Sequence, residues 1–206
     1  MSPASPAGST SLRQTALYPL HLSRQGKMVD FAGYSMPLQF AAGIKAEHLH
    51  TRAHAGLFDV SHMGQIHIRG DAACTALEHL VTGDIPGLAD HQQRYTLLTN
   101  AAGGIIDDLM VAKVAGGLEL VVNAATKEQD VAYLESALPP GCELELMQDR
   151  ALLALQGPQA VQVLTRHAPG IATLHFMRGG RYRIDDGQKR RSSCTPTVRG
   201  RKRMRA

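Results

Sequence analysis

The chain has 206 residues, of which 44% are hydrophobic and 19% charged, a composition typical of one globular domain or a close pair. No apolar run approaches the ~18 residues needed to cross a bilayer, so we expect no membrane partner. The three scattered cysteines support neither a disulfide framework nor a Cys-x-x-Cys metal site, and they favour a reducing compartment.

The net charge of +4 comes entirely from the C-terminal end. Residues 1–177 hold 11 Lys and Arg against 16 Asp and Glu, whereas residues 178–206 hold 11 against two. Clustered arginines can bind nucleic acid or an anionic membrane, but this segment has no apolar period, so we predict a basic, disordered tail and no nucleic-acid partner. Residues 1–16, rich in Ser, Pro, Ala and Gly, predict a disordered leader without the apolar stretch of a signal peptide.

Between residues 17 and 177 helical and strand-like patterns alternate, which predicts the α+β fold class. A helix is expected over residues 42–55, where Gly56 ends it, and a strand over residues 65–69. The next helix is expected to begin at Asp71, whose side chain suits the N-cap position.

An antiparallel meander is predicted in the middle of the chain. Its strands cover residues 94–99, 109–114 and 118–122, and glycine-containing turns separate them. Thr126 followed by Gln129 has the spacing of a capping box, which predicts another helix. The remaining expected elements are a strand over residues 142–147, an apolar run over residues 151–155 and a helix after Pro158.

Polar side chains are concentrated in the segment GLFDVSHMG at 56–64. Adjacency of Asp59, Ser61 and His62 does not make a hydrolase triad, because triad members must converge in defined roles. Two interpretations stay open: Asp59 and Ser61 satisfy buried backbone N–H groups in a tight loop, or the loop borders a ligand pocket.

A possible metal site lies in the helix before this segment. Glu47, His50 and His54 are spaced to share one helical face. Short patterns of this kind occur often by chance, and an exposed His-rich face explains them as well. We therefore expect no metal.

Two consecutive carboxylates, Asp107 and Asp108, follow Gly103-Gly104 at the start of an apolar strand. Strand alternation predicts that they point to opposite faces, so that one supports the glycine turn and the other projects into a ligand cavity. A partly desolvated carboxylate can accept a proton or stabilise a developing positive charge. A solvated turn explains this motif equally well on its own.

Seven segments, in matching order and spacing, together closely resemble the glycine cleavage system T protein family, the aminomethyltransferases. They are MVDFAGYSMPLQF at 28–40, EHLHTR at 47–52, GLFDVSHMGQI at 56–66, QRYTLLTN at 93–100, GGIIDDLMV at 103–111, LVVNAA at 120–125 and ALLALQGPQA at 151–160. The resemblance implies the N-terminal part of a three-domain, cloverleaf-like α+β fold with antiparallel sheets, packed helices and folate in a central channel.

The resemblance also implies an activity and its site. Family members transfer the aminomethyl carbon from the lipoylated H protein to the co-substrate tetrahydrofolate and release ammonia. By matching positions, Asp108 resembles the catalytic carboxylate that faces the folate amines. Tyr95 and Asn123 resemble folate-channel residues, Met63 lines the same wall, and Asp107 supports the turn. A cytoplasmic location is implied, or the mitochondrial matrix for a eukaryotic protein.

The sequence departs from the family after Met177. The later family segments, which supply a pterin-binding glutamate and tail-binding arginines, are missing, so residues 17–177 are expected to form an incomplete folate-binding region with weak or no activity. Codons for residues 198–205 read one base later permit Tyr-x-Gly-Glu-x-Gly-Cys-Glu, close to a missing segment, which predicts a frameshifted gene. The alternative function is that of a folate-binding regulatory or iron-sulfur assembly relative without transferase activity.

Overall fold

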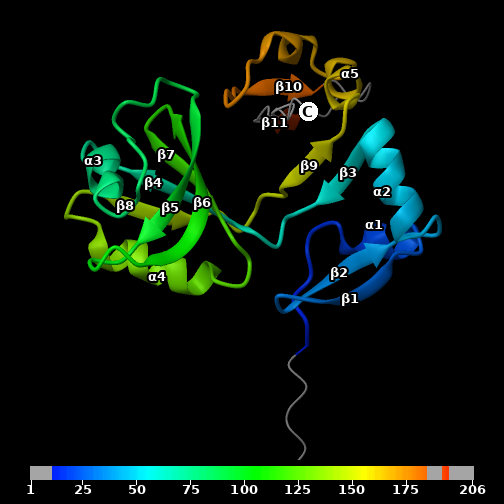
Figure 1. Ribbon diagram of the computed structural model, residues 1–206, viewed down its shortest axis with the longest axis horizontal. Helices are drawn as coiled ribbons and strands as arrows, with labels where there is room; N and C mark the ends of the chain where they lie inside the picture. The colour runs from blue at the N-terminus through cyan, green and yellow to red at the C-terminus, as the bar shows by residue number, and fades with distance from the viewer. Residues whose placement is uncertain (1–10, 185–191, 195–206) are drawn as a thin grey trace, which may run out of the picture.

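The computed structural model describes residues 11–184 and 192–194 of the chain. Its centre is a five-stranded antiparallel sheet in the order β5-β6-β7-β4-β8 (Figure 1). The strands are β4 (Gly64–Arg69), β5 (Gln93–Thr99), β6 (Ile105–Val114), β7 (Gly117–Val122) and β8 (Glu143–Leu146). The predicted meander, β5-β6-β7, and the α+β class are confirmed.

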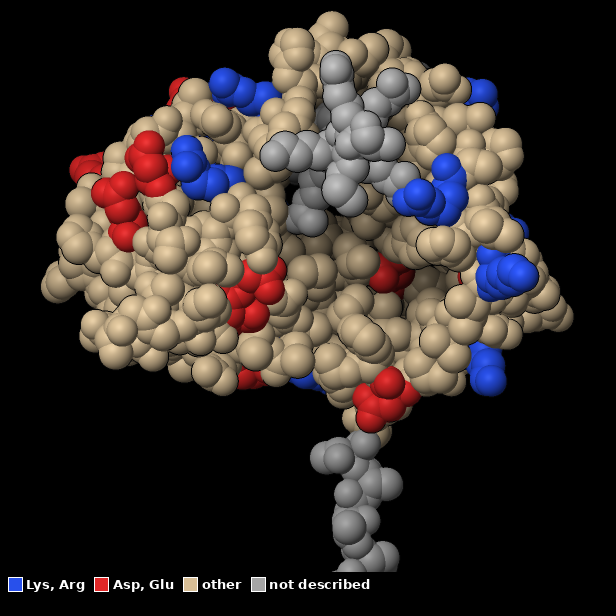
Figure 2. Space-filling view, viewed as in Figure 1, with Lys and Arg blue, Asp and Glu red and all other residues tan. Residues whose placement is uncertain are grey.

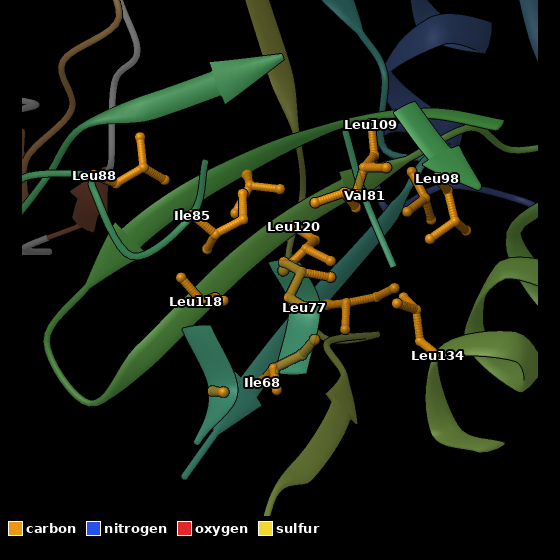
Figure 3. Packing of buried hydrophobic residues seen from close by; sticks show 14 residues of the cluster. Ile68, Leu77, Val81, Ile85, Leu88, Leu98, Leu109, Leu118, Leu120 and Leu134 are labelled. Carbon is orange, nitrogen blue, oxygen red and sulfur yellow. The ribbon is translucent and has the colours of Figure 1, made fainter. Parts of the chain in front are cut away.

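One face of this sheet is buried beneath two helices, α3 (Ala73–Glu78) and α4 (Lys127–Ala137). Alternate residues of the strands point into the core, as the two-residue period of a strand requires. Leu118 and Leu120 of β7 are completely buried, and so are Leu77 of α3 and Leu134 of α4 (Figure 3). The residues between them on each strand are directed to the opposite face of the sheet.

A second part of the molecule precedes the sheet and lies beside it in Figure 1. It contains α1 (Tyr18–Ser23), the hairpin of β1 (Lys27–Phe31) and β2 (Tyr34–Gln39), α2 (Ile44–Ala53) and β3 (Gly56–Asp59). β3 pairs antiparallel with β9 (Leu153–Gln156), so the chain leaves for the sheet and returns along the same two-stranded ribbon. After β9 come α5 (Ala160–Thr165), a 3-10 helix (Pro169–Thr173), β10 (Tyr182–Ile184) and β11 (Ser192–Cys194).

Of the two predicted helix caps, the position of Thr126 is confirmed, the position of Asp71 is wrong, and neither side chain forms a capping hydrogen bond. Ala72, not Asp71, occupies the N-cap of α3, and no side chain caps that helix. Thr126 is at the N-cap of α4, but its hydroxyl donates a hydrogen bond to Asp107 instead of accepting one from the helix backbone. The charge-assisted bond to the carboxylate is the stronger of the two possible interactions, and it directs the threonine hydroxyl to β6 and not to the helix backbone.

The predicted disordered leader, residues 1–16, needs correction for residues 11–16. The backbone of Arg13 forms an isolated β-bridge with Tyr34. The Arg13 guanidinium lies 4.3 Å from the centre of the Tyr34 ring and forms a salt bridge of 2.6 Å with Glu128. Thr15 is buried. Residues that are distant in the sequence hold this polar segment in place, and local composition does not reveal such contacts. Residues 1–10 lie outside the described residues.

Regular structure also continues past the expected boundary at Met177. Gly179 donates its backbone N–H to the carbonyl of His91, and β10 pairs antiparallel with β11. Backbone hydrogen bonds hold this segment, and they need no apolar period in the sequence. The expectation of a disordered tail is therefore corrected for residues 178–184 and 192–194, while its remainder lies outside the described residues. No helix within the described ranges has the length and apolarity to cross a bilayer.

Candidate functional site

Neighbouring strands bring the four expected site residues together near the end of β7. Val122, the last residue of β7, is paired with β6 on one side and with β4 on the other. The next residue after Val122 is Asn123, which lies between Asp108 on the side of β6 and Met63 on the side of β4. Tyr95 on β5 belongs to the same face, two positions from the residue that pairs with Asp108. Figure 2 shows a hollow between the sheet and the N-terminal part, with acidic side chains at its border.

The two consecutive aspartates point to opposite faces of β6, as strand alternation predicts. Asp107 pairs with Leu98, which is completely buried on the core side, and its carboxylate is directed to α4. Asp108 pairs with Leu97 and shares the opposite face with Tyr95, a residue that is 57% exposed. Asp108 is thus the carboxylate available to a ligand.

The amide of Asn123 connects both aspartates. Its Nδ2 lies 2.9 Å from Oδ1 of Asp107, 3.2 Å from Oδ1 of Asp108 and 3.1 Å from the Asp108 carbonyl oxygen. The backbone N–H of Asp108 also donates to Oδ1 of Asp107 at 2.8 Å. Asp107 therefore fixes the backbone and the amide that together orient Asp108.

Electrostatics keep the two faces distinct. Burial raises the pKa of Asp107, but hydrogen bonds from Thr126, Asn123 and the Asp108 backbone outweigh it, and the net shift is downward. Asp107 is therefore ionised at neutral pH. The pKa of the Tyr95 phenol is raised by loss of hydration and then by the negative charges of Asp108 and Asp107. Tyr95 thus remains a neutral aromatic surface beside a negative charge.

The glycine turn before β6 is held by Asn100 rather than by Asp107. Oδ1 of Asn100 accepts the backbone N–H groups of Ala102 at 3.0 Å and Gly104 at 2.9 Å. Gly103 has a φ of +79°, a conformation that favours glycine. The expected role of Asp107 in this turn is wrong, because an asparagine that precedes the turn is better placed to close it.

The segment 56–64 contains a strand, β3, followed by a tight turn. Asp59 accepts hydrogen bonds from the Ser61 backbone N–H at 3.0 Å and from Thr15 Oγ1 at 2.6 Å, and His21 Nε2 lies 2.8 Å from its carboxylate. The interpretation that Asp59 satisfies buried donors is confirmed. Its partners Thr15 and His21, from the start of the chain, were not predicted by any local signal.

The candidate metal ligands of α2 have other contacts. Glu47 accepts the backbone N–H of Phe40 at 2.7 Å, and the rings of His50 and His54 lie 5.0 Å apart. Within residues 11–184 and 192–194, no group of three or more His, Cys, Asp or Glu side chains is arranged to hold a metal ion.

Comparisons with known proteins agree with this architecture. The family model of the GCVT N-terminal domain matches residues 17–192. The aminomethyltransferase of Prosthecochloris aestuarii is 41% identical, and the match covers 80% of this chain and 48% of that protein. The mitochondrial aminomethyltransferase of Homo sapiens is 47% identical, and the match covers 74% of this chain and 40% of that protein. The crystal structure of glycine cleavage system aminomethyltransferase T from Bartonella henselae superposes with a TM-score of 0.77 at 43% identity, covering 82% of this chain and 47% of that one. The chain thus spans less than half the length of these relatives, and the predicted fold is confirmed.

Proposed function

Because the chain belongs to the family of the GCVT N-terminal domain, we propose that it forms the tetrahydrofolate-binding N-terminal part of an aminomethyltransferase. Its reaction would transfer the aminomethyl carbon from the lipoylated H protein to tetrahydrofolate and release ammonia. The observation that carries the proposal is the Asp108 carboxylate, held by Asn123 on the open face of the sheet beside an exposed Tyr95.

The geometry suits each part of this chemistry. A folate amine attacks the aminomethyl carbon, whose bonds to the lipoyl sulfur and to its own nitrogen break as the second folate amine closes the methylene bridge. The two amine protons are taken up by the departing sulfur and nitrogen. Asp108 would orient the attacking amine and take its proton in passing, because a fixed carboxylate favours the cation that develops there. Tyr95 and Met63 would supply the aromatic and thioether surfaces against which the flat pterin lies.

We also propose the lipoylated H protein as the partner. Relatives from bacteria and from mitochondria are consistent with a cytoplasmic location or, for a eukaryotic protein, the mitochondrial matrix.

A test compares two proteins for tetrahydrofolate binding and turnover: the 206-residue chain, and a hybrid that joins residues 1–177 to the part of the Bartonella henselae relative that follows its matching region. We expect the hybrid to bind tetrahydrofolate at least about tenfold more tightly, because each charge-assisted hydrogen bond that the second half adds is worth ~1.5–3 kcal/mol. Calorimetry measures the affinity, and formation of methylenetetrahydrofolate from aminomethyl-loaded H protein measures turnover.

Three outcomes separate the alternatives. Turnover by the hybrid supports the proposed activity. Binding without turnover indicates instead a folate-binding relative that is not a transferase. Turnover by the 206-residue chain equal to that of the hybrid contradicts the expectation that this chain is weakly active or inactive alone.

A further inference from the structure

Behind the site lies a third carboxyl group that the proposed chemistry does not use. Asp130 belongs to α4 and is completely buried. It lies one helical turn after Thr126, whose carbonyl accepts the Asp130 backbone N–H at 2.8 Å, so both side chains share the helix face that meets Asp107. Neither carboxyl oxygen of Asp130 has a partner with full hydrogen-bond geometry, and the Asp107 carboxylate and the Thr126 hydroxyl are the side chains close enough to act on it.

An ionised Asp130 would be strongly disfavoured in these surroundings. Burial of a charge without a partner is costly, and the nearest ionisable groups, Asp107 and Asp108 on β6, carry the same charge. Lys127 on the same helix is directed elsewhere, since its Nζ donates to the Tyr34 hydroxyl at 2.6 Å and to the His62 carbonyl at 3.1 Å. In the described part of the chain, no ion pair involves Asp130.

A proton on Asp130 resolves this conflict. Two ionised carboxyl groups offer only acceptors to one another, so without a proton neither can satisfy the oxygens of the other. A protonated Asp130 is a donor, and the Asp107 carboxylate is the acceptor that influences it most. Asp107 already accepts hydrogen bonds from Thr126, Asn123 and the Asp108 backbone, so a fourth donor completes its environment.

We propose that Asp130 keeps a proton up to about neutral pH and donates it to Asp107, which makes Asp130 a positioning residue for Asp108 and makes the geometry of the site depend on pH. The proposal extends the proposed function, because the positioned residue is the carboxylate assigned to the folate amine. Asp107 connects Asp130 to Asp108, because it binds the Asn123 amide and the Asp108 backbone N–H that hold Asp108 in position.

The electrostatics give the direction of the pH dependence. Burial, followed by the interactions with Asp107, raises the pKa of Asp130 from 3.8 to about 7, against a smaller opposing effect of the Thr126 hydroxyl. Below this pH Asp130 and Asp107 share one proton and stay hydrogen-bonded to each other. Above it both groups are negatively charged, and their repulsion separates them. The folded protein binds this proton more tightly than the unfolded chain does. The contribution of Asp130 to stability is therefore fully present below about pH 4 and is lost as the pH rises from about 4 to about 7.

Carbon-13 NMR of the aspartate carboxyl groups tests the proposal directly on the 206-residue chain. We expect one carboxyl resonance to titrate near neutral pH in the parent and to vanish in Asp130→Asn, whose amide keeps the shape and a donor. In Asp130→Leu, which has no donor, the pKa of Asp107 should rise relative to Asp130→Asn. Titration of Asp130 at its ordinary value, ~3.9, would overturn the proposal.

Unfolding in urea at several pH values provides an independent measurement. As the pH rises from about 4 to about 7 the parent should lose stability relative to Asp130→Asn, and above about pH 7 the difference should become constant. The matched control is Glu135→Gln, which removes an exposed carboxyl from the same helix and should leave the pH profile of the parent unchanged. Parallel profiles for the parent and Asp130→Asn contradict the proposal, even if Asp130→Leu fails to fold.

A functional measurement in the hybrid separates this inference from the proposed function. Asp130→Asn should keep kcat near the parent value and weaken its decline above pH 7, whereas Asp130→Leu should lower kcat at least about tenfold at every pH. An unchanged pH profile of kcat in Asp130→Asn contradicts this positioning role. If the hybrid neither binds nor converts tetrahydrofolate, the proposed function fails, and the NMR titration alone decides the protonation of Asp130.

Discussion

Replacement of Asp108 by asparagine in the hybrid is expected to lower kcat by about 10²–10⁴-fold while changing the affinity for tetrahydrofolate only modestly. An asparagine preserves the shape of the side chain and one acceptor oxygen, so the contact with Asn123 can persist. It cannot accept the amine proton or offset the positive charge that develops at the folate nitrogen. Single-turnover kinetics with aminomethyl-loaded H protein measures the chemical step, and calorimetry measures binding.

The matched control is Asp90→Asn, which removes one exposed carboxylate from the connection before β5, away from the four expected site residues. It should leave both kcat and affinity within about twofold of the parent, as is usual for surface substitutions. Equal losses in both variants would indicate a general effect of net charge. Full activity of Asp108→Asn would remove Asp108 from the chemistry.

Local patterns in the sequence were sufficient for most of the sheet. The two-residue period predicts β5, β6 and β7, and the same parity places Asp107 and Asp108 on opposite faces before any partner is known. This works because the orientation of neighbouring side chains on a strand depends only on the strand itself. The resemblance then assigned Asp108, Tyr95, Asn123 and Met63, and the fold brings them together near the end of β7.

Contacts distant along the chain account for what the sequence did not predict. The capping-box spacing at Thr126 is a local signal, yet the threonine is bound by Asp107, which lies 19 residues earlier. Asp130 belongs to a helix with many polar side chains, and nothing in the nearby sequence indicates that it is one of the two that are buried. Its position depends on how α4 packs against β6, which the period of either element does not specify.

The same explanation applies to Asp59, the most heavily bonded carboxylate of the N-terminal part. Its side chain is 1% exposed, and its partners Thr15 and His21 come from 44 and 38 residues earlier in the chain. Burial raises the pKa of Asp59, but hydrogen bonds from Ser61, Thr15 and His21 outweigh burial and lower it overall. The ionised carboxylate therefore fastens the start of the chain to the turn that carries Met63.

Asp59→Ala is expected to lower the free energy of unfolding of the 206-residue chain by about 3–5 kcal/mol, because removal of one partner leaves the other buried polar groups unsatisfied. The lowered pKa of Asp59 gives this stabilisation a pH signature: it is fully present above the unfolded pKa, near 3.9, and is lost as the pH falls through the folded value. Urea unfolding at pH 7 and at decreasing pH measures both effects. Asp71→Ala, at an exposed aspartate that caps no helix, should change stability by less than about 0.5 kcal/mol. A difference between parent and Asp59→Ala that is small at pH 7, or that grows on acidification, would show that the carboxylate does not hold these segments together.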